Sequence, residues 1–178
     1  MKANAMTIWV FRLCRWSALL GGAILCLMTL MIVASITGRS LMGLGLGPIP
    51  GDVELVEAGT AIAVFMLLPW AYLKDGHASV DVVYLHMPRV AQRAVQLISD
   101  ALMLLVWLAL TWMLFEGMLE KRSYEETTFI LQMPVWWAYA LCGVGAAVGC
   151  LAYLTKPLIV LGLADWPTGW PTETTKEH

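Results

Sequence analysis

Four long apolar stretches occupy more than half of this 178-residue chain, and they constrain its fold more than any other feature. The hydrocarbon core of a bilayer is about 30 Å thick, so a helix needs about 20 residues to cross it. Water is absent from that core, so backbone groups there must pair within their own segment, which favours helices. We therefore predict an all-α polytopic membrane protein with four transmembrane helices, at about 16–37, 54–73, 93–118 and 134–156.

The composition leaves little material for anything besides the membrane-spanning part. Hydrophobic residues make up 60% of the chain and charged residues only 13%, against about 25% charged residues in soluble domains. The first apolar stretch is longer than the core of a secretory signal peptide, so we expect it to be retained. We divide the chain into a basic entry at 1–15, a membrane domain at 16–156 and a tail at 157–178. The pattern at 6–15 is compatible with an interfacial helix on the membrane surface.

The distribution of basic residues predicts the orientation in the membrane. If the N-terminus lies inside, eight of the eleven Lys and Arg residues fall in inner segments and three in outer ones. Positive residues resist translocation, so this asymmetry places both termini in the cytoplasm. The inner set is Lys2, Arg12, Arg15, Lys74, Arg89, Arg93, Lys156 and Lys176, and the outer set is Arg39, Lys121 and Arg122.

The connection between the second and third stretches carries a motif of its own. It reads Gly76-His77-Ala78-Ser79-Val80-Asp81. Asp81 suits the cap of a short helix that would lie along the inner membrane surface, through about Met87. His77 and Asp81 are metal-ligand types, but two ligands without companion carboxylates make a loose constellation. We therefore expect a short interfacial helix, a solvated histidine and no metal site in this connection.

Several ionisable residues lie near the ends of the predicted helices. Glu54 and Glu57 share one face at the start of the second helix, where the helix dipole favours negative charge. They serve either as helix-start charges or as polar contacts with Arg39 or a partner subunit. Asp100 follows Arg93 by two helical turns, and local pairing explains it as well as a proton relay does. The full set of candidate partner-interface or structural polar contacts is Arg39, Glu54, Glu57, His77, Asp81, Arg93 and Asp100.

The centres of the four stretches contain no charged residue, which argues against several functions. Secondary transporters bind substrate and ions near the membrane midplane, often at helix breaks, and the break at Pro69 lies near a helix end. Haem-binding helices need axial histidines, whereas His77, His86 and His178 lie outside the stretches. The four cysteines form no CxxC pair. We expect no enzyme activity and no cofactor, and we interpret the chain as an accessory subunit.

Several short motifs follow one another in a specific order and spacing. Gly38-Arg39 follows the first helix, and Glu54 with Glu57 opens the second. The later motifs are the 76–81 stretch, Leu85-His86-Met87-Pro88 before the third helix, and Pro134-Val135-Trp136-Trp137-Ala138-Tyr139 at the fourth. In these motifs and in its predicted topology, the chain resembles the DctQ-type small permease subunit of tripartite ATP-independent periplasmic (TRAP) transporters.

This resemblance implies a subunit of the bacterial inner membrane that binds a large permease subunit. The large subunit would carry the substrate and sodium sites, and a periplasmic binding protein would deliver an organic acid to the pair. The small subunit would widen the rigid scaffold against which the transport domain of the large subunit moves. Membrane lipid would cover the remaining surface, and no nucleic-acid partner is expected.

Two functions of other classes remain open from the sequence. A membrane anchor subunit of a respiratory or redox complex is one, although the absence of histidines within the predicted helices argues against haem. A self-assembling channel or exporter is the other. A haem absorption band would favour the first, and transport by this chain alone would favour the second.

Overall fold

Four long helices make up most of the protein that the structure describes. The computed structural model describes residues 5–74 and 89–160. The described elements are α1 (Ala5–Ser40), the short 3-10 helix η1 (Met42–Leu44), α2 (Asp52–Leu73), α4 (Arg89–Ser123) and α5 (Trp136–Val160). Each of the four long helices is long and apolar enough to cross a membrane. The predicted all-α fold is confirmed, with four helices of the length and composition needed to cross a membrane, whereas the short helix expected at 81–87 lies outside the described residues.

The first helix is longer than predicted. Residues 6–15 do not form a separate interfacial helix, because α1 runs without a break from Ala5 to Ser40. No Gly or Pro interrupts residues 5–16, so nothing in the local sequence ends the helix at the expected boundary. Val10, Phe11 and Cys14 on this segment are buried in a cluster with α2 and α5 residues. Packing against the other helices thus determines where residues 6–15 lie.

The other helix ends also differ from the predicted ones by a few residues. α2 begins at Asp52 rather than at residue 54, and Gly51 takes the N-cap position with a φ of 75°. α4 continues beyond residue 118 to Ser123, and α5 continues beyond residue 156 to Val160 with Pro157 inside it. The last turn of α5 is held by core packing, since Ile159 is buried.

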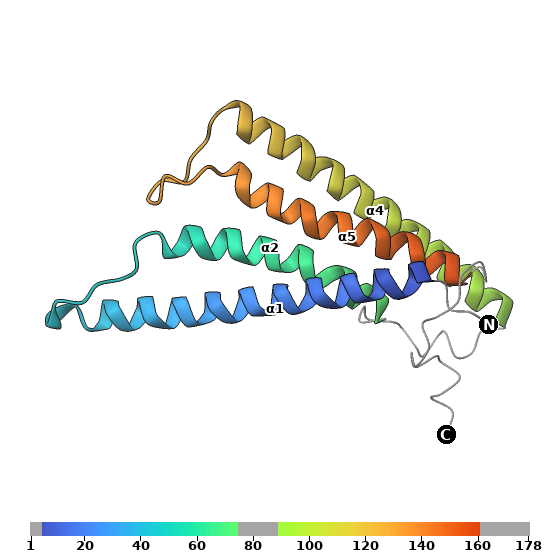
Figure 1. Ribbon diagram of the computed structural model, residues 1–178, viewed down its shortest axis with the longest axis horizontal. Coiled ribbons are helices and arrows are strands. Elements are labelled where there is room, and N and C mark those ends of the chain that lie inside the picture. The colour runs from blue at the N-terminus through green and yellow to red at the C-terminus, as the bar shows by residue number, and fades with distance from the viewer. Residues whose placement is uncertain (1–4, 75–88, 161–178) are drawn as a thin grey trace, which may run out of the picture.

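The helices lie side by side in the order α1, α2, α5, α4 (Figure 1). α2 packs against α1 on one side and α5 on the other, and α4 packs against α5. The α1–α2 pair and the α4–α5 pair converge at one end and spread apart at the other. We call the end with the first turn of α1 and the last turn of α5 the closed end, and the end with η1 and the 124–135 loop the open end.

Two buried clusters hold the closed end together. Each joins side chains from three helices, so burial there links both helix pairs, at about 25 cal/mol per Å² of apolar surface. One cluster consists of Val10, Phe11, Cys14, Leu73, Ala152 and Ile159, and the other consists of Tyr72, Trp107, Ala146 and Tyr153.

Glycines on α5 allow its close approach to the neighbouring helices. A Cβ atom added at Gly145 would lie 2.8 Å from the Phe65 carbonyl carbon and oxygen of α2. A Cβ at Gly149 would collide with the indole ring of Trp107 on α4. The sequence predicts tight helix packing at this small-residue surface, and the structure places that packing inside the subunit.

Candidate functional site

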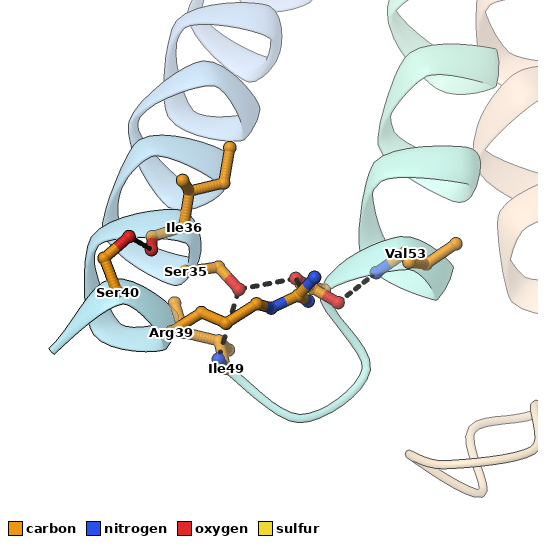
Figure 2. Close-up of polar contacts among 7 residues, drawn as sticks. Ser35, Ile36, Arg39, Ser40, Ile49 and Val53 are labelled. Carbon is orange, nitrogen blue, oxygen red and sulfur yellow. Dashed lines mark hydrogen bonds and ion pairs between the residues drawn. The ribbon is translucent and has the colours of Figure 1, made fainter. Parts of the chain in front are cut away.

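A polar network at the open end joins α1 to the start of α2. Ser35, which is buried, donates a hydrogen bond of 2.5 Å from its hydroxyl to Asp52 Oδ2. The same hydroxyl accepts a hydrogen bond of 3.3 Å from the Ile49 N–H, and Asp52 Oδ1 accepts one of 2.8 Å from the Val53 N–H (Figure 2). The Arg39 guanidinium lies 3.9 Å from Asp52 Oδ2. Ser35 and Asp52 therefore hold the first loop in place between α1 and α2.

Arg39 pairs with a different acid from the two that the sequence suggested. Its described ion-pair partner is Asp52 rather than Glu54 or Glu57. The side chain of Arg39 remains 62% exposed, and exposed ion pairs of this kind contribute little to stability. Most of the guanidinium thus remains available for contacts outside the chain.

Gly38 allows the first loop to fold back on α1. A Cβ atom at this position would collide with the carbonyl oxygen of Gly47. The loop backbone therefore lies directly on the last turns of α1, next to Ser35 and Arg39. The Gly38-Arg39 motif combines this close approach with the charge that faces Asp52.

Glu54 joins the start of α2 to the loop between α4 and α5. Its two carboxylate oxygens accept hydrogen bonds from the Ile130 N–H at 2.7 Å and the Leu131 N–H at 3.1 Å. Leu131 also packs on Gly51, where an added Cβ would meet the leucine side chain at 2.5 Å. Hydrogen bonds to an ionised acceptor are stronger than neutral ones. Glu54 thereby connects the two helix pairs at the end where they spread apart.

Replacing Glu54 with glutamine is expected to loosen this loop. The amide accepts through one oxygen only, and its NH₂ group would face a backbone N–H. We expect the Ile130 and Leu131 amides to exchange their hydrogens about tenfold faster in Glu54→Gln, as measured by hydrogen–deuterium exchange in detergent. Glu57→Gln, one turn along α2, should leave both exchange rates unchanged, and equal rates in Glu54→Gln and the native protein would contradict the assignment.

A cleft of about 910 Å³ lies between the two helix pairs, next to the 124–135 loop. Its walls are mostly apolar and come from all four long helices and the loop. Glu57 lies on its lining and is exposed. Lys121 and Glu126, also on the lining, form an ion pair of 2.7 Å. Apolar lining residues include Ile24, Met28, Phe65, Leu114, Leu131 and Leu141.

A second polar cluster lies at the closed end and is buried. The Tyr72 hydroxyl of α2 donates a hydrogen bond of 2.7 Å to Asp100 Oδ1 of α4. The ammonium group of Lys156, on α5, donates to the Tyr72 carbonyl oxygen at 3.2 Å and lies 4.4 Å from the centre of the Tyr72 ring. Asp100 and Lys156 are each only 5% exposed. Charged groups at such depth are stable only with polar partners, and Tyr72 supplies contacts to both.

An aromatic stack continues from this cluster into the bundle. The rings of Tyr72 and Tyr153 stack at 4.0 Å between centroids, and those of Tyr153 and Trp107 at 4.8 Å. The Trp107 indole N–H donates to the Ala146 carbonyl oxygen at 3.0 Å. Side chains of α2, α5 and α4 thus alternate in a single stack, which fixes the relative positions of the three helices.

The predicted site residues divide between the two ends. Arg39, Glu54 and Glu57 lie at the open end, and Asp100 lies in the buried closed-end cluster. Arg93 belongs to α4, but its side chain lies outside the described part of the structure, so its pairing with Asp100 stays a prediction. His77 and Asp81 lie outside the described residues.

A comparison with protein families identifies the chain. A model of the family "Tripartite ATP-independent periplasmic transporters, DctQ component" matches residues 28–160. The chain belongs to the DctQ family. The match covers α2, α4 and α5 entirely and residues 28–40 of α1, and so includes both polar clusters. No curated protein matched the chain.

Membership in the DctQ family confirms the resemblance found in the sequence and makes this protein the small-subunit type of TRAP transporter component. Four residues of the polar clusters in this DctQ protein were not among the candidates predicted from the sequence, namely Ser35, Asp52, Tyr72 and Lys156. Tyr72 and Lys156 each lie where an aromatic or basic residue is expected at a membrane boundary. Their burial depends on the pairing of helices that are far apart in sequence.

Proposed function

We propose that this DctQ protein is a scaffold for a large permease subunit. In this function it supports sodium-coupled uptake of an organic acid that a periplasmic binding protein delivers. Membership in a family of tripartite transporter components supports the proposal. The large subunit, rather than this chain, would bind the substrate and sodium.

The observation that carries this proposal is the small share of each span that the chain itself buries. In the most apolar window of each helix, 11% of residues in α1, 22% in α2, 11% in α4 and 39% in α5 are buried. Most of the apolar surface therefore faces lipid or another membrane protein. A subunit that presents so much apolar helix surface is suited to extend another protein within the bilayer.

Several polar groups between the described helices make contacts within the chain. At mid-depth, Trp107 donates to Ala146 and Thr111 donates to the Trp107 carbonyl oxygen at 2.8 Å. Substrate and ion sites in secondary transporters are formed by polar groups and broken helices near the midplane. In the described helices, the inner prolines Pro69 and Pro157 both lie towards the closed end. This arrangement supports a structural function for the chain.

A deletion strain tests the proposed function in the cell. The strain would express the large permease and the binding protein but not this chain, and uptake of the radiolabelled acid would be measured. We expect uptake to be lost and to return when this chain is supplied in trans. Native uptake without the chain would overturn the proposed scaffold function.

We also propose that the closed end faces the cytoplasm of an inner-membrane protein. The first turn of α1 and the last turn of α5 lie at this end, and most basic residues lie in the segments next to it. In a background without native cysteines, we expect an impermeant maleimide applied from the periplasm to label Gly43→Cys but not His86→Cys. The reverse labelling pattern would contradict this orientation.

A further inference from the structure

The cleft at the open end contains an acidic side chain, Glu57, that pairs with no other residue in the described part of the structure. Glu57 lies on α2 five residues after its first residue, Asp52, or about 7.5 Å along the helix axis. It is exposed on the cleft lining and makes no hydrogen bond or ion pair with any described residue. An ionised carboxylate inside a membrane span is costly unless a cation or a polar group accompanies it.

The other charges at the mouth of the cleft are already paired. The Glu54 carboxylate accepts two backbone N–H groups, and Glu126 is bound by Lys121 at 2.7 Å. Three acids and one base thus line the cleft, which leaves its mouth negatively charged. A ligand that fits must combine an apolar part for the walls with a positive charge at the level of Glu57.

We propose that this cleft receives a transmembrane segment of the large permease subunit, with apolar side chains and one Arg or Lys that pairs with Glu57. This inference rests on the proposed function. A phospholipid amine would also supply a cation, but it brings a phosphate that the negative mouth repels. A basic protein side chain brings no such anion, and an ion pair shielded from water gives binding specificity as well as affinity.

Charge variants of the complex test the inference. Affinity of the purified large permease for Glu57→Gln would be compared with that for the native chain in one detergent. We expect binding to weaken about thirtyfold or more, because one partner of a desolvated pair is lost. Glu116→Gln is the matched control, since Glu116 is an exposed acid on α4 outside the cleft lining. The permease should bind this variant with the same affinity as the native chain. Equal thermal stability of both variants would show that folding is unaffected.

A photo-crosslinking amino acid identifies what occupies the cleft. Placed at Leu141, which lines the cleft, it should link to a permease peptide that contains an Arg or Lys. Placed at Leu151, exposed on the same helix away from the cleft, it should not link to that peptide. Changing that basic residue to Glu should restore binding to Glu57→Lys.

Three results would overturn the inference in distinguishable ways. Native affinity of Glu57→Gln would show that Glu57 binds no permease cation. Phospholipid adducts alone at Leu141 would make the cleft a lipid site. In both cases a stable complex with normal uptake would leave the scaffold function intact. Failure of the native chain to bind the permease at all would overturn both proposals.

Discussion

Gly145→Leu is expected to prevent α2 and α5 from packing and to cause the largest loss of stability of any single substitution in this subunit proposed here. A Cβ atom at position 145 already lies 2.8 Å from the backbone carbonyl of Phe65, and leucine adds three further carbons. Overpacking typically costs about 1–3 kcal/mol when side chains can move. Here the neighbour is the backbone of α2, so we expect a cost at or above that range.

Thermal unfolding of the purified subunit in detergent measures this effect. Gly143→Leu is the matched control, because it places the same side chain on the same helix where nothing lies within 4 Å of an added Cβ. We expect the control to unfold at the native temperature. The proposed packing of α2 on α5 would be wrong if Gly145→Leu unfolded at the same temperature as Gly143→Leu.

Tyr72→Phe is expected to cause the second largest loss. The change removes the hydroxyl group that donates to Asp100 at 2.7 Å but keeps the ring that stacks on Tyr153. A buried acceptor that loses its donor costs about 1–3 kcal/mol, and more if it is charged. The free energy of unfolding should fall by about this amount, as measured by SDS titration in mixed micelles.

Two further variants show whether this loss comes from the hydroxyl group. Tyr124→Phe removes a hydroxyl from an exposed residue in the turn after α4 and should leave stability unchanged. Tyr72→Phe combined with Asp100→Leu should be less destabilised than the sum of both single changes, because the two residues share one contact. Strict additivity would show that the hydroxyl and the carboxylate do not interact.

The four spans were predictable because a transmembrane helix is specified by its own length and apolar composition. The small residues Gly145 and Gly149 predict close helix packing for the same local reason, but the sequence did not identify α2 and α4 of the same chain as the partners. The N-terminal boundary of the first span was not predictable, because the continuation of α1 through residues 5–15 depends on contacts of Phe11 and Cys14 with α2 and α5. The local sequence of residues 5–15 is compatible both with a separate interfacial helix and with a continuous first helix.

The partners of the polar residues could not be predicted from one sequence. The sequence predicts Glu54 as an acid at the start of a helix, and it lies in the first turn of α2. Its contacts, however, are backbone N–H groups 76 and 77 residues away. For Asp100 the sequence suggests Arg93 on the same helix as a partner, whereas a described partner, Tyr72, comes from α2. Such pairs depend on which helices become neighbours, and the apolar patterns of four similar spans do not determine that.

Uptake by purified components in proteoliposomes tests the scaffold function most directly. Vesicles would contain this subunit alone, the large permease alone or both, with an inward sodium gradient and binding protein loaded with its acid. We predict uptake only in vesicles that contain both membrane subunits. Sodium-driven uptake by this subunit alone, or full uptake by the large permease alone, would contradict the scaffold function.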